Sequence, residues 1–111
     1  MTAAAGRPAE PAVPSALLGR LLAEAGLSIE RPLFVAEDAG RRGGWVYLVG
    51  HRLWHEARAP LVAVCAAATA LAEGAGLALR FEALRSERAP EGARPAGDWE
   101  RTVWPQLAAR L

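Results

Sequence analysis

The sequence predicts an α+β fold, a two-layer sandwich in which a three-stranded, mostly antiparallel sheet packs against helices. Apolar residues recur at helical spacing in three segments, and strand-like apolar runs bounded by glycine lie between them. The resulting order is helix, strand, strand, helix, strand, helix, for which a layered sandwich is the simplest way to bury the apolar faces. A chain of 111 residues fits one domain with its own core.

Residues 1–14 consist mostly of alanine, proline and glycine. We expect a flexible tail there, because repeated prolines prevent a regular helix. Residues 15–111 are expected to form a single domain. The first helix is predicted to begin at Ser15, a favourable N-cap residue, and to end at Gly26. Its core face is formed by leucines three or four positions apart: Leu17, Leu18, Leu21 and Leu22.

Two apolar runs, 31–36 and 45–54, flank a glycine-rich turn and predict a β-hairpin. In the second run, residues 45–49 are apolar without alternation. That pattern is typical of an inner strand covered on both faces. We therefore expect this strand in the middle of the sheet.

A helix over residues 61–73 is expected after Pro60, a good first helical residue. It belongs to an uncharged stretch over residues 59–72, which is shorter than the roughly 20 apolar residues that span a bilayer. Because this helix is apolar nearly all round, we expect it to be buried on most sides. In so small a chain, a second subunit is expected to supply part of that cover.

Strict alternation over residues 77–84 predicts a half-exposed strand, with Arg80 and Glu82 pointing away from the core. A loop is expected over residues 86–97. Asp98 is then expected to cap a last helix that Pro105 interrupts. The core stripe of that helix repeats every four residues: Trp99, Val103, Leu107 and Leu111.

The charge balance argues against a general attraction to nucleic acid or anionic membrane, because the formal net charge is +1. All 13 basic residues are arginine, and lysine and asparagine are absent. That bias is typical of a GC-rich genome, and the scarcity of Asn, Gln, Cys and Met is compatible with thermophilic origin. The N-terminus lacks the apolar segment of a secretory leader, so the cytoplasm is the expected location.

No catalytic, cofactor-binding or metal-binding set is predicted. A single cysteine, Cys65, excludes an intramolecular disulfide, and in an apolar helix it is typical of inert packing. His51 and His55 would lie about 13 Å apart on the expected strand, too far to share a metal ion. The sequence offers no reactive constellation and leaves enzymatic activity open.

Aromatic and basic residues concentrate in and beside the expected hairpin, over residues 39–58. Such a set can stack bases and hold phosphates. Trp45 and Trp54 are separated by an odd number of positions, however, so a regular strand would point them to opposite faces. The candidate contact residues are Arg41, Arg42, Trp45, Tyr47, His51, Arg52 and His55.

The expected function is that of a non-enzymatic interaction or regulatory module that forms a homodimer, because apolar surface exceeds what three strands can cover. One alternative is a nucleic-acid-binding module that uses the hairpin. Another is a small enzyme or ligand binder with a pocket near His51 and His55. No membrane partner is expected.

Overall fold

The computed structural model describes residues 13–29, 32–37, 43–86 and 88–109, and within them it confirms the α+β class. The described elements form a four-stranded mixed sheet and five helices. In chain order they are α1 (Pro14–Glu24), β1 (Phe34–Glu37), β2 (Gly43–Val49), α2 (His51–Glu56), α3 (Arg58–Gly74), β3 (Ala78–Leu84), β4 (Arg94–Pro95), α4 (Ala96–Thr102) and α5 (Trp104–Ala108).

The sheet has the strand order β3-β2-β1-β4. The predicted hairpin is confirmed, since β1 pairs antiparallel with β2, and β2 lies inside the sheet as expected. The prediction of three mostly antiparallel strands is wrong in two respects. The segment expected as loop 86–97 contains β4, which pairs antiparallel with β1, and β3 runs parallel to β2. The parallel direction follows because α2 and α3 carry the chain back along the sheet between these two strands.

The second strand is shorter than predicted, because β2 ends at Val49 and the chain turns into α2. On this helix Leu53 is buried in the core, and Trp54 is half-buried and packs against the core. An exposed ion pair between Arg52 and Glu56, with Nε and Oε1 3.2 Å apart, adds an i,i+4 contact on the same helix. The expected strand 45–54 is therefore a strand followed by a helix.

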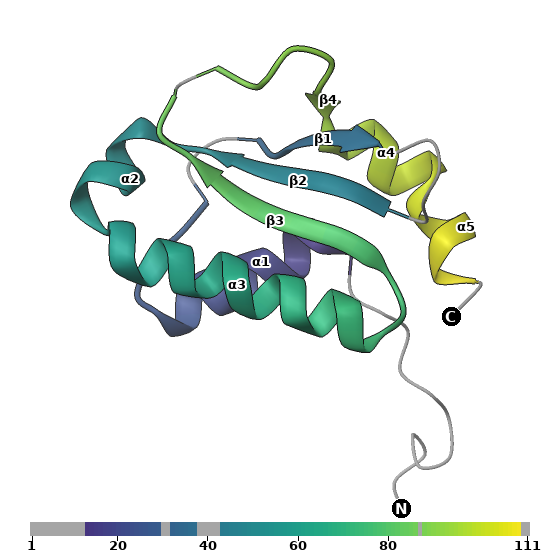
Figure 1. Cartoon of the computed structure of the whole chain (residues 1–111), viewed down its shortest axis with the longest axis horizontal. Coiled ribbons are helices and arrows are strands. Elements are labelled where there is room, and N and C mark those ends of the chain that lie inside the picture. The colour runs from purple at the N-terminus through teal and green to yellow at the C-terminus, as the bar shows by residue number, and fades with distance from the viewer. Residues whose placement is uncertain (1–12, 30–31, 38–42, 87, 110–111) are drawn as a thin grey trace, which may run out of the picture.

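Helices α1 and α3 lie on one face of the sheet, as Figure 1 shows. The side chains directed toward that face are buried in alternation along the strands. They are Val35, Val46, Leu48, Leu79 and Phe81. On the opposite face Trp45 and Tyr47 are only half-buried, so the expectation that both faces of residues 45–49 are covered is wrong.

Helix α3 is buried along one face and exposed along the other, which corrects the expectation of a helix buried on most sides. Val62 is 47% exposed and Leu71 is 50% exposed. The buried face consists of Leu61, Val64, Cys65, Ala68 and Ala72.

The C-terminal helices attach to the start of α1. The backbone N–H and the hydroxyl of Ser15 both donate to the Glu100 carboxylate, at 3.2 and 2.7 Å. Ser15 is thus held by a side chain from α4 and is not the N-cap, because α1 begins at Pro14, which is itself buried. Trp99 is fully buried, and its ring centroid lies 5.8 Å from that of Trp104.

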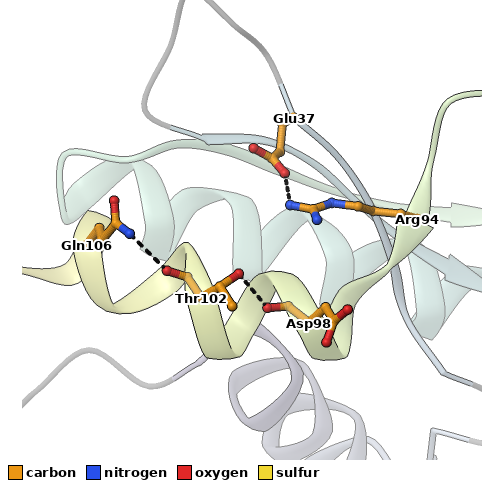
Figure 2. Close-up of polar contacts among 5 residues, drawn as sticks. All are labelled: Glu37, Arg94, Asp98, Thr102 and Gln106. Atoms are coloured by element: carbon orange, nitrogen blue, oxygen red, sulfur yellow. Dashed lines mark hydrogen bonds and ion pairs between the residues drawn. The ribbon is translucent and has the colours of Figure 1, made fainter.

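Polar contacts around α4 and β4 are drawn in Figure 2. Arg94 forms an ion pair with Glu37, which connects β4 to the end of β1. The Thr102 hydroxyl donates to the Asp98 carbonyl at 2.8 Å, and the Gln106 amide donates to the Thr102 carbonyl at 3.1 Å. The expected interruption of the last helix lies at Val103, between α4 and α5, while Asp98 lies in the first turn and not at the cap.

Candidate functional site

An open groove of about 850 Å³ runs along β3. Helix α3 supplies one wall, through Ala66, Thr69, Ala70 and Glu73. The strand itself and the preceding turn, residues 76–82, supply the remainder together with Trp45 of β2. In Figure 1 β3 forms one border of the sheet with α3 below it, so the groove lies at the edge of the molecule's two layers.

The groove contains the outer hydrogen-bonding edge of β3. Within the described part of the chain, β2 is the one strand that β3 pairs with. The Phe81 N–H donates to the Thr69 hydroxyl at 2.9 Å, so the Phe81 amide points away from β2. Because backbone groups alternate along a strand, the amide and carbonyl groups of Leu79 and Ala83 also point outward. This edge can accept a further strand.

Thr69 is the polar contact between α3 and this edge. Its hydroxyl donates to the Cys65 carbonyl at 2.9 Å within the helix and accepts the Phe81 N–H. One side chain therefore satisfies the central outward amide of β3. The flanking groups of Leu79 and Ala83 have no such bond among the described residues.

The flank of α3 beside the groove is small and, apart from Thr69 and Glu73, apolar. Val62 lies seven positions before Thr69, which is two helical turns along the same face. Ala66 lies between these two residues, and Ala70 directly follows Thr69. The side chains of Val62, Ala66 and Ala70 are exposed. The described structure thus places an unpaired strand edge next to a helix surface on which Glu73, near the end of α3, is the charged residue that lines the groove.

A second surface is the open face of the sheet, where aromatic side chains are neighbours across strands. Phe34 pairs with Tyr47, and Trp45 lies beside Arg80 of β3. All three aromatic side chains are half-buried. Glu82 lies beside Tyr47 and, after burial, is the second cause of the raised pKa of that phenol. On the described strands, the two charges of this face, on Arg80 and Glu82, cancel.

The predicted contact residues do not form a single cluster in the described structure. Trp45 and Tyr47 share the open face of β2. Arg52 and His55 lie exposed on α2. His51 begins α2, but its side chain lies outside the described part, as do Arg41 and Arg42 entirely.

Trp54 does not join the open-face aromatics either. It is stacked by Arg58, whose guanidinium carbon lies 4.8 Å from the ring centroid, and it packs against the helical side of the core. The expectation that one strand points Trp45 and Trp54 to opposite faces does not apply, because Trp54 lies on the helix α2 and not on β2.

The described residues contain no group of three or more His, Cys, Asp and Glu side chains that could hold a metal ion. His51 and His55 do lie one helical turn apart, since the expected strand is a helix there. The groove is lined by neither of them. A pocket near these histidines therefore stays a prediction.

Of the residues that line the groove, Trp45 is the one that the sequence predicts as a site residue; the residues that it misses include Thr69, Arg80 and Glu82. The alternation of residues 77–84 correctly places Arg80 and Glu82 on the exposed side of their strand. The pattern contains no information about which strands lie at the edge. Thr69 could have been noticed as the one polar residue in an otherwise uncharged helix segment.

No family model, no curated protein and no solved structure matches this chain. No helix in the described ranges is long and apolar enough to cross a membrane. What the chain does is therefore inferred from its own residues.

Cys65 is a free, buried cysteine on α3, and its environment disfavours the thiolate. Burial, followed by the charge of Glu82, raises the pKa of the thiol from 9.0 to about 11. We expect alkylating reagents at pH 8 to label Cys65 slowly in the native protein and quickly in urea, because the thiolate is the reactive form. Mass spectrometry of the labelled chain measures this.

The same pKa shift predicts a pH dependence of stability. A thiol whose pKa is raised on folding stabilises the native state below about pH 9, and that contribution is lost as the pH rises through about 11. The expected slope is at most about 1.4 kcal/mol per pH unit. A Cys65→Ala variant should lack this component; equal slopes for both proteins would contradict it.

Proposed function

We propose that the chain is a non-enzymatic interaction module that self-associates through the exposed side of α3, which Val62 borders next to the groove and Leu71 borders on the opposite flank. The observation that carries the proposal is the outer surface of this helix. Between Arg58 and Glu73 it has no charged residue, yet Val62 and Leu71 remain half-exposed. Apolar surface of this kind usually marks a contact site.

Helix α3 differs in this respect from the other long helix. The exposed side of α1 includes Arg20 and Glu24, which solvate it. On α3, by contrast, the exposed positions are mostly alanine and the two larger apolar side chains. Alanine adds little hydrophobic area per residue, so the expected association is modest and depends on Val62 and Leu71.

Self-association is tested by replacing these two side chains. The wild-type chain is expected to reach about twice its 11.7 kDa mass in light scattering at micromolar concentration. A Val62→Asp/Leu71→Asp variant, which changes both borders of the exposed side, should raise the dissociation constant at least about tenfold, because an aspartate within the contact would have to be desolvated. Ala23→Asp, on the exposed side of α1, is the matched control. A wild-type monomer at high micromolar concentration would contradict the proposal.

We propose single-stranded nucleic acid binding as a second candidate function. It is favoured by the half-buried Phe34, Trp45 and Tyr47 on the open sheet face, a platform on which bases can stack. Because the charges of Arg80 and Glu82 cancel, we expect most of the binding free energy to come from base stacking and little from phosphate contacts.

Tryptophan fluorescence tests this candidate. Titration with a single-stranded oligonucleotide is expected to quench the emission, and Trp45→Ala should weaken binding by about 1–3 kcal/mol, the contribution of one stacked base. Trp54→Ala is the control variant and should leave binding unchanged, because Trp54 lies on α2, away from the open face. Unchanged emission together with an unshifted gel mobility would rule this candidate out.

A further inference from the structure

We infer that β3 is the strand through which two copies of this chain pair, antiparallel, around a two-fold axis at Phe81. The inference deepens the proposed self-association and rests on it. Pairing of two β3 strands would join two four-stranded sheets into one continuous sheet. It would also cover the groove that β3 and α3 leave open.

The position of the axis follows from the charges on β3. Outward-facing residues of one strand must meet outward-facing residues of the other, so a two-fold axis passes through a residue position. With the axis at Phe81, Arg80 of each copy lies opposite Glu82 of the other, which gives two attractive cross-strand pairs. An axis at Arg80 or at Glu82 would place like charges opposite each other. An axis at Leu79 or Ala83 would leave both charges opposite uncharged positions.

The same register also continues the core. Phe81 meets Phe81 of the second copy on the helical side, and Leu79 meets Ala83, so apolar residues lie opposite apolar residues. These are the positions whose backbone amides and carbonyls point outward. The pairing therefore satisfies the Leu79 and Ala83 groups that have no partner in the described single chain.

Helix α3 permits this approach because its flank beside the edge is small. Ala66 and Ala70 line the groove and are exposed, and Val62 extends the same flank. The two α3 helices would lie on the same side of the joined sheet, next to the axis. Association would thus bury the apolar part of this flank, formed by Val62, Ala66 and Ala70, together with the strand edge.

The hydrogen bond of Thr69 to the Phe81 amide stabilises the single chain relative to the dimer. In the single chain its hydroxyl accepts the Phe81 amide, so the central donor of the edge is already satisfied. On pairing, that amide would donate to the Phe81 carbonyl of the second copy, while Thr69 keeps its bond to the Cys65 carbonyl. A Thr69→Val variant, which leaves the amide unpaired in the single chain, should therefore dimerise more tightly than wild type, and Thr69→Ser should not.

Charge reversal tests the register. Arg80 and Glu82 are exposed, so Arg80→Glu and Glu82→Arg should both fold, which circular dichroism verifies. Each variant alone places like charges opposite each other twice and is expected to weaken its homodimer about tenfold. Mixed in equal amounts, the two variants should recover wild-type association as a heterodimer, observed by native mass spectrometry. Arg20→Glu and Glu24→Arg on α1 are the controls with the same charge changes.

The outcomes separate the two proposals. Weak homodimers that recover on mixing, with tighter association of Thr69→Val, support the β3 pairing. A wild-type dimer that neither reversal weakens, or weakened variants that do not recover on mixing, would overturn the pairing and leave self-association through another surface standing. A wild-type chain that stays monomeric at high micromolar concentration would overturn both.

Discussion

The parallel pairing of β2 and β3 is the constraint on which the rest of the structure depends. A strand can follow its parallel neighbour only if the chain first returns along the sheet, and here α2 and α3 make that return. Helix α3 must then pack against the sheet, which buries Leu61, Val64 and Cys65 in the core. The same crossover places β3 at the border of the sheet, because nothing later in the described chain pairs with its outer side.

The two surfaces of the molecule follow from this arrangement. Because the described helices α1 and α3 share one face of the sheet, the aromatic side chains of β1 and β2 remain half-exposed on the other. Because α3 covers the sheet with one side only, its uncharged outer side stays in solvent beside the β3 edge. Thr69 reduces the number of unpaired backbone groups on that edge, because its hydroxyl accepts a hydrogen bond from the Phe81 amide. The groove is therefore a partly protected edge that a second strand could complete.

Sequence patterns predicted the features that depend on neighbouring residues. Alternation over residues 77–84 correctly gave buried Leu79 and Phe81 beside exposed Arg80 and Glu82, and the glycine turn marked the hairpin. The patterns failed where distant packing decides. Residues 51–54 were expected to continue the second strand, yet they belong to α2, where Leu53 is buried in the core. A two-residue strand such as β4 has no pattern of its own, and strand order leaves no trace in alternation.

The candidate site was predictable only in part, for a similar reason. The uncharged run over residues 59–72 predicted a helix buried on most sides, but it could not show which side of α3 stays exposed, since alanine is tolerated on either side. The contact of Thr69 with the strand edge depends on a backbone amide twelve residues away in sequence. Of the predicted contact residues in the hairpin, Trp45 lines the groove, which otherwise lies along β3, on the side of β2 away from β1.

Residue-resolved hydrogen exchange tests the central claim most directly, because it observes the outer edge of β3 itself. The amides of Leu79 and Ala83 should exchange quickly in dilute protein and become protected as the concentration rises through the range in which the dimer forms. The Glu82 amide, which faces β2, should show much less dependence on concentration. Fast exchange of Leu79 and Ala83 at every concentration, in a chain that nevertheless dimerises, would contradict the account.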